Sequence, residues 1–314
     1  MIRYVTVVNY LGEALIMPLS YPEASGIVVR DITGIGPGSA SINTSEINTN
    51  DGSLYNSARL GQRNIILTLQ FFDQSLTAEE IRHLTYKYFP IKKPITLFFE
   101  TDERVCMIDG YVETNEPVIF SSGGNGASAS TAEYTQISVI CPYPYFYSAG
   151  ADGEHTTVFF GIDPKFEFPF SNESLYENMI EFGEIQQMTE QVIEYYGDAE
   201  IGVEIHINSI GTVGNITIYN TGTREMMTID VSKIEALTGE GIVAGDEIII
   251  NTVRGHKSIR LLRGGRYINI LNALDKDADW FQLAHGENVF AYTATSGTSN
   301  LQFRIMNRVI FEGV

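Results

Sequence analysis

Residues 26–72 read GIVVRDITGIGPGSASINTSEINTNDGSLYNSARLGQRNIILTLQFF, and this stretch decides the fold. Both ends predict strands, because residues 27–32 are mostly apolar and residues 63–71 alternate apolar with polar side chains. The residues between them are rich in Gly, Ser, Asn and Thr, and Asn50-Asp51-Gly52 is a signal for a two-residue turn. We therefore predict a protruding β-hairpin arm at about residues 34–60, built to touch another subunit.

The rest of the first half predicts one helix among strands. Residues 77–80 read TAEE, a capping box that begins a helix at about residues 77–89, and Pro90 ends it. Strands are predicted at residues 95–100, 105–113 and 135–141. Prolines 142 and 144 then interrupt the strand pattern, and a polar, Gly-rich stretch follows. We place a domain boundary there, which gives an N-terminal domain of residues 1–148 and a C-terminal domain of residues 149–314.

The second half predicts many short strands. Apolar residues alternate along residues 201–207 and again along 216–218, and turn residues separate the segments. One short helix is predicted near residues 233–237. The fold class is therefore mainly β: a β-sandwich-like N-terminal domain with the arm and one helix, followed by an antiparallel β-sandwich.

The chain is acidic, and its charge is unevenly spread. The net charge of −19 argues against a surface for nucleic acid, and no apolar run reaches the ~20 residues that a membrane-spanning helix needs. The first residues lack a signal-peptide pattern, so we expect folding in a cytoplasm. No Lys or Arg lies between Lys165 and Arg224, whereas a basic series follows at residues 254–266. We favour solvated surfaces for both; the alternative is that opposite patches meet across a repeated head-to-tail interface.

The sequence predicts no enzyme, cofactor or metal site. Cys106 and Cys141 lack the spacing of a metal site and predict buried, reduced thiols. The five histidines are dispersed, and no motif pairs a nucleophile with a base. The run GIGPG at residues 34–38 is unlike a phosphate loop, because it contains Pro37 and no helix follows it.

Several segments in order resemble one known family. They are the strand at residues 27–32 with the following TGIGPG, the strand that resumes at Arg63, the single helix, GYVE at 110–113 and CPYPYF at 141–146. Together they resemble the distal tail (Dit) proteins of siphophages, the long-tailed phages, that infect Gram-positive hosts. In the second half, FEFPF at 166–170, Asp246 before a strand, and DWFQL at 279–283 resemble the galectin-like C-terminal domain of that family.

The resemblance implies a structural virion protein at the tail tip, made and assembled in the host cytoplasm. Its first domain would form a homohexameric ring that joins the tail tube protein to the tail-tip hub protein. Tape measure and receptor-binding proteins are further partners that it suggests. Tail-derived bacteriocins use related components and remain an alternative. The candidate contacts between subunits are Ile35, Pro37, Asn50, Asp51, Gly52, Tyr55, Arg63, Arg260 and Arg263.

Two other functions compete with the ring. A carbohydrate-binding module for cell-wall polysaccharide could use Trp280, the single tryptophan, as an aromatic platform, although we favour core packing beside Phe281. A tail-tip hydrolase would need a pair of carboxylates at a set separation, and we expect none.

Overall fold

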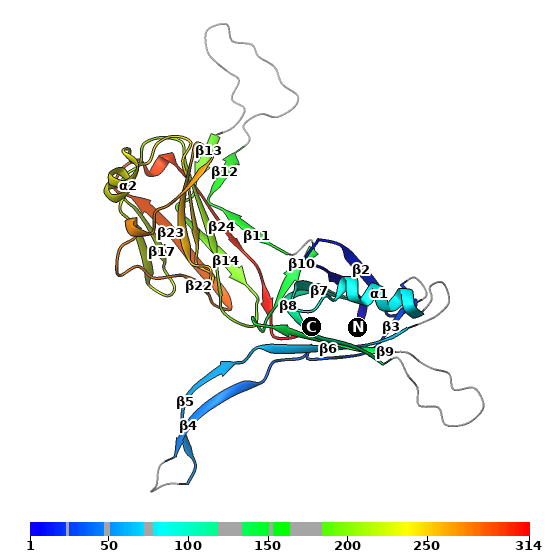
Figure 1. The fold of residues 1–314 in the computed structure, drawn as a ribbon. Helices are drawn as coiled ribbons and strands as arrows, with labels where there is room; N and C mark the ends of the chain where they lie inside the picture. Colours follow the sequence, from blue (N-terminus) through cyan, green and yellow to red (C-terminus); the bar gives the residue numbers. More distant parts are fainter. Residues whose placement is uncertain (23–24, 47–50, 72–77, 119–133, 151–152, 164–183) are drawn as a thin grey trace, which may run out of the picture. The chain divides into compact units, whose positions relative to one another are not determined.

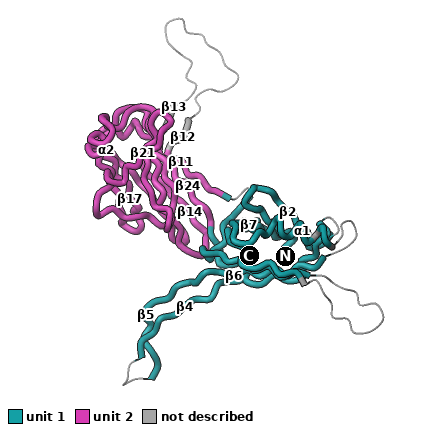
Figure 2. The backbone as a smooth tube through the Cα atoms, viewed as in Figure 1, with its two compact units in different colours: residues 1–153, 310–314 teal, residues 154–309 magenta. Residues whose placement is uncertain are grey.

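The computed structural model describes residues 1–314 except 23–24, 47–50, 72–77, 119–133, 151–152 and 164–183 (Figure 1). The chain divides into two compact units: unit 1 contains Met1–Gly153 and Ile310–Val314, and unit 2 contains Glu154–Val309 (Figure 2). The sequence placed residues 149–314 together, whereas the last five residues are part of unit 1. The reason is local: β25 (Ile310–Phe311) pairs with β10 (Phe146–Ala149) in the unit 1 sheet.

The body of unit 1 contains an antiparallel sheet of nine strands and a helix. Its main strand order is β2-β1-β7-β8-β9-β6-β3, and β10 and β25 extend it beside β8. These seven strands are β1 (Ile2–Val8), β2 (Ala14–Pro18), β3 (Ile27–Thr33), β6 (Arg63–Phe71), β7 (Pro94–Thr101), β8 (Val105–Val118) and β9 (Tyr134–Cys141).

The sheet of unit 1 curls around a single core. Residues from both ends of the strand order, such as Met17 in β2 and Ile27 in β3, are fully buried in the same apolar cluster. Helix α1 (Ala78–Tyr88) packs Leu84 and Tyr88 against this cluster. The predicted helix is therefore confirmed in position, while its capping residue Thr77 lies outside the described residues.

Unit 2 contains two larger antiparallel sheets. The six-stranded sheet has the order β11-β24-β16-β19-β20-β21, and the four-stranded sheet has the order β14-β23-β17-β18. The six strands are β11 (His155–Val158), β24 (Leu301–Asn307), β16 (Glu204–Ser209), β19 (Glu247–Asn251), β20 (Ser258–Arg263) and β21 (Arg266–Asn269). The four are β14 (Glu190–Tyr195), β23 (Gly286–Ala294), β17 (Ile216–Asn220) and β18 (Glu225–Ile229).

The two sheets of unit 2 pack through aromatic side chains. Tyr292 of β23 stacks on Phe303 of β24, with ring centroids 4.8 Å apart, and Phe159 packs against both rings. Shorter elements complete the unit: β12 (Phe160–Asp163), β13 (Glu184–Gln187), β15 (Ile201–Gly202), β22 (Gln282–Leu283), α2 (Val231–Thr238), η3 (Leu271–Ala273) and η4 (Thr298–Asn300). The predicted fold class, mainly β with a sandwich in the second half, is confirmed.

The predicted arm is present as a separate two-stranded sheet. Strand β4 (Ala40–Glu46) pairs with β5 (Ser53–Leu60), and the hairpin extends from the body of unit 1 (Figure 1). Ser53 pairs with Glu46, so residues 47–52 connect the strands. The two-residue turn at Asp51-Gly52 is therefore wrong, although Gly52 does take a positive φ of 94°. Asn50 lies outside the described residues.

Candidate assembly surface

The strands of the arm are exposed over nearly their whole length in the described structure. Every described residue from Ala40 to Arg59 is exposed to solvent. An isolated two-stranded hairpin is at best marginally stable in water, because it has no third layer on which to bury a face. In the part of the chain that the structure describes, the strands of the arm are therefore open to solvent on both faces up to Arg59.

The two faces of the arm differ in chemistry. Cross-strand partners share a face, and the register places Ile42 opposite Ala58, Thr44 opposite Tyr55, and Ala40 opposite Leu60. We name these six residues the apolar arm face. Ile42 and Tyr55 are each 65% exposed. The other face is mostly polar, with Ser41 opposite Arg59 and Asn43 opposite Ser57.

A buried arginine fixes the base of the arm. Arg63, at the start of β6, is 5% exposed and donates hydrogen bonds to four backbone carbonyls. The acceptors are the oxygens of Gly34 (2.6 Å), Gly36, Pro144 (2.7 Å) and Glu312 (2.7 Å). Its guanidinium also lies 4.7 Å from the centre of the Phe146 ring. Burial lowers the pKa of Arg63, but a guanidinium still remains charged at neutral pH.

The prediction that Arg63 contacts another subunit does not fit this geometry. Its donors are used inside the protomer, where they join the chain before the arm to the segment after β9 and to the C-terminal residues. Its role is to hold the arm to unit 1.

Gly34 marks the point where the chain leaves β3 for the arm. Its φ is +83°, and a Cβ at this position would lie 2.0 Å from the backbone oxygen of Asn64. Only glycine combines that conformation with so close an approach. Next to it, the Val314 amide donates to the Ile35 carbonyl (3.1 Å), and Ile35 packs partly against the core. Pro37 is exposed at the rim of this base.

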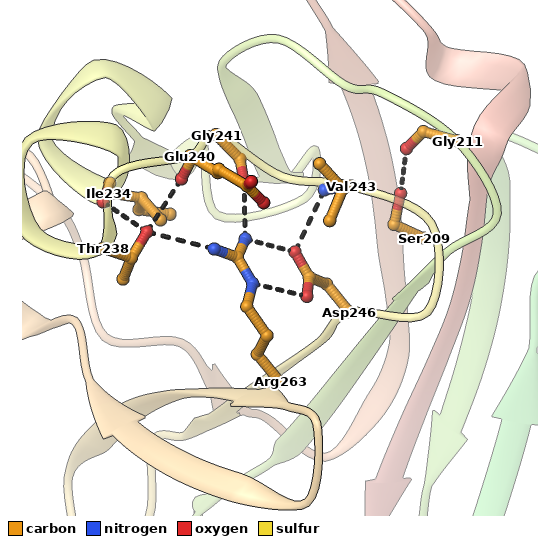
Figure 3. A network of polar contacts seen from close by, with 9 residues as sticks. All are labelled: Ser209, Gly211, Ile234, Thr238, Glu240, Gly241, Val243, Asp246 and Arg263. Carbon is orange, nitrogen blue, oxygen red and sulfur yellow. Dashed lines mark hydrogen bonds and ion pairs between the residues drawn. The ribbon is translucent and has the colours of Figure 1, made fainter.

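Arg263, one of the basic residues of unit 2, makes its contacts inside that unit. Arg263 donates to Asp246 (2.8 Å), Thr238 (3.1 Å) and the Gly241 carbonyl, and Asp246 is 2% exposed (Figure 3). The hydrogen bond to Asp246 raises the pKa of Arg263. Arg263 therefore stabilises the loop that precedes β19 and is not free for a neighbouring subunit. Arg260 is exposed and lies 5.2 Å from the Tyr267 ring.

Trp280 is half-buried, while its neighbour Phe281 is fully buried. The Lys257 ammonium lies 5.1 Å from the centre of the Trp280 ring, which is the distance of a cation–π contact. The packing of Trp280 in the core, which the sequence favoured, is therefore only partial: Phe281 fills the core, and Trp280 retains some exposed surface.

Cys106 and Cys141 are buried free thiols. Burial raises the pKa of Cys106, and it raises the pKa of Cys141 to about 12, so both are neutral at pH 8. In the described part of the chain, no three His, Cys, Asp or Glu side chains are grouped to hold a metal ion. No described helix is long and apolar enough to cross a membrane.

Comparisons with known proteins give a match in structure. No family model matches the chain, and no curated protein matches it in sequence. The crystal structure of the phage SPP1 Dit protein, described as a paradigm of the hub adsorption apparatus in phages that infect Gram-positive bacteria, matches with a TM-score of 0.62. The two chains are 13% identical, and the match covers 98% of this chain and 99% of that one.

Two structures of the phage P2 baseplate in its activated conformation, with calcium and with strontium, match at TM-scores of 0.47 and 0.46. Each is 12% identical to this chain; coverage is 98% of both chains for the first and 97% of both for the second. The SPP1 match is the stronger one, and it spans both units and agrees with the resemblance found in the sequence. The chain has the fold of a phage distal tail (Dit) protein over nearly its whole length.

Proposed function

We propose that this chain is a structural protein of a phage tail tip that assembles side by side with copies of itself into a hexameric ring. The observation that carries the proposal is the exposed arm: within the described residues, only Leu60 at the base of its apolar face is half-buried. If the arm docks on a neighbour, each copy makes two contacts: its own arm lies on one neighbour, and the arm of the other neighbour lies on it. Such a heterologous contact generates a ring when the rotation closes.

The number of six subunits and the finer position in the virion are part of the proposal, and the resemblance to Dit proteins together with the Dit-like fold supports them. A Dit-like protein would join the tail tube protein to the tail-tip hub protein and would carry peripheral adhesion proteins. The alternative is that the chain is the equivalent baseplate component of a tail-derived bacteriocin. The net charge of −19 fits a ring around a channel that must not retain DNA, because like charges repel.

The test is a deletion that removes the arm and leaves its base intact. Ala40 and Leu60 already pair, so residues 41–59 can be replaced by Asn-Gly, which closes a two-residue hairpin. We expect the full chain to form closed rings by sedimentation and negative-stain imaging, and the deletion to stay monomeric with unchanged melting of both units. Rings from the deletion variant, or a full chain that is monomeric at every concentration, would contradict the proposal.

Binding of cell-wall polysaccharide is the second candidate, and the exposed part of Trp280 is what favours it. Lys257 lies over the ring and would have to move for a sugar to stack there. A pull-down on purified cell walls that compares wild type with Trp280→Ala distinguishes a sugar-binding protein from a purely structural one. Saturable binding that the substitution removes would support the sugar site.

A further inference from the structure

The chain passes from unit 1 into unit 2 and then returns to unit 1. It leaves unit 1 after Gly153 and re-enters it at Ile310, so unit 2 is inserted between β10 and β25. We name the five residues that re-enter, Ile310–Val314, the return segment. Two of them pair in the sheet, Ile310 with Tyr147 and Phe311 with Phe146. Each hydrogen bond adds little net stability, so this short pairing is weak by itself.

The return segment lies against the base of the arm. Arg63, which fixes that base, donates a hydrogen bond to the Glu312 carbonyl (2.7 Å). The Val314 amide donates to the Ile35 carbonyl (3.1 Å). Gly313 fits closely between them, because a Cβ at this position would lie 3.2 Å from the Ile35 oxygen. The return segment therefore holds the chain at the point where it enters the arm.

One exposed side chain of unit 1 also holds the return segment. The Arg104 guanidinium lies 4.2 Å from the centre of the Phe311 ring and donates to the Gly313 carbonyl (3.3 Å). Contacts of an exposed side chain are weak, because water competes for them. The return segment is therefore held by several small contributions.

The fold of unit 2 brings together the two points where the chain crosses between the units. β11 pairs with β24, and their register places His155 opposite Asn307. Paired strands lie ~4.8 Å apart, so the first and last strands of the folded unit are neighbours. If unit 2 unfolds, the return segment must instead close a loop as long as the whole of unit 2. The entropic cost of closing a loop rises with its length.

We propose that the return segment couples the arm to unit 2, because it docks on the base of the arm only while unit 2 is folded. The folded unit delivers the return segment beside β10, whereas an unfolded unit adds a loop-closure cost that the few docking contacts do not offset. Undocking removes the Glu312 acceptor of Arg63 and the hydrogen bond to Ile35. The other acceptors of Arg63 still hold the arm to unit 1, but its base is loosened. This coupling operates within one protomer and does not rest on the proposed ring.

A substitution in the core of unit 2 tests the coupling. Phe303 is fully buried and stacks on Tyr292, so Phe303→Asp should unfold unit 2, which the emission of Trp280 reports. We expect hydrogen exchange of the return segment in the full chain to become at least tenfold faster, while β6 stays protected. Phe303→Leu, which keeps an apolar side chain, is the matched control. An unchanged return segment beside an unfolded unit 2 would overturn the proposal.

The reverse experiment changes unit 1 and measures unit 2. Coupling is reciprocal, so a substitution that weakens docking should lower the stability of unit 2. Gly313→Val places a branched side chain against Ile35, whereas nothing lies within 4 Å of a Cβ at Gly61, which makes Gly61→Val the control. Both glycines belong to unit 1. We expect Gly313→Val alone to shift the urea midpoint of Trp280 emission to a lower concentration. Equal midpoints for the two variants would show that unit 2 does not sense the return segment, and the coupling would be refuted.

Discussion

At the scale of single residues, Arg63 holds the base of the arm in a fixed position on unit 1. Its four carbonyl acceptors lie in three segments, from Gly34 to Glu312, that are far apart in the sequence. Replacing it leaves those carbonyls without a donor and a cavity beside Phe146. We expect Arg63→Ala to lower the free energy of unfolding of unit 1 by about 3 kcal/mol or more.

Urea unfolding measures this loss, and Arg59→Ala is the matched control because Arg59 is exposed on the arm. The control should change stability by less than about 0.5 kcal/mol. Lysine should not rescue position 63, since an ammonium cannot reproduce the fork of a guanidinium. Equal stability of the two alanine variants would contradict the role given to Arg63.

Gly34 supplies a second prediction at this scale. Gly34→Ala would place a methyl group against the Asn64 carbonyl in a backbone conformation that alanine avoids, so we expect a loss of about 2 kcal/mol or more. Gly36→Ala is the control, because nothing lies within 4 Å of the position that a Cβ would take there. Thermal melts compare the two. A Gly34 variant that melts with the wild type would show that the turn is not constrained as described.

In unit 2, Arg263 and Arg260 form a matched pair of arginines on one strand. Arg263→Ala breaks a buried pair with Asp246 and leaves that carboxylate without its partner, which costs about 3 kcal/mol in comparable sites. Arg260→Ala removes an exposed side chain and should cost less than about 0.5 kcal/mol. Unfolding followed by Trp280 fluorescence reports on unit 2, and a reversed order of the two variants would refute this assignment.

At the scale of elements, we expect the arm to become stable when a neighbouring copy covers it, because an isolated two-stranded hairpin is only marginally stable. We expect backbone amides of β4 and β5 to exchange with deuterium within seconds in the monomer, because the hairpin is thin and exposed. Assembly should slow their exchange at least a hundredfold, while β6, whose ladder is buried in both states, should change little. Fast exchange of the arm in assembled particles would mean that the arm is not the contact.

Much of this element structure could be predicted from local pattern. Alternation along residues 63–71 predicted β6, and the polar composition between two apolar strands predicted the arm. The two-residue turn at Asp51-Gly52 was wrong because the register pairs Ser53 with Glu46, and the local Asp-Gly signal does not reveal that register. The role of Arg63 could not be predicted, since its partners are up to 249 residues away and are backbone atoms that leave no mark in the sequence. The bonds that Arg263 makes to Asp246 could not be predicted either, because they depend on how β20 is placed beside the loop before β19.

At the scale of the whole molecule, we propose that copies of this chain close side by side around a hollow axis. In this proposal unit 1 contributes the arm, and its core and the Arg63 anchor keep the base of the arm in place. Unit 2 has its own core and does not need the ring to fold, so variants in unit 2 should leave the particle closed.

Electron microscopy of purified full-length particles, with symmetry determined from averaged end views and mass measured on the same sample, tests this closure most directly. We predict a closed ring of six copies with an open axis and an arm lying on each neighbour. A lone protomer whose arm folds back on its own unit, or an open filament, would contradict it.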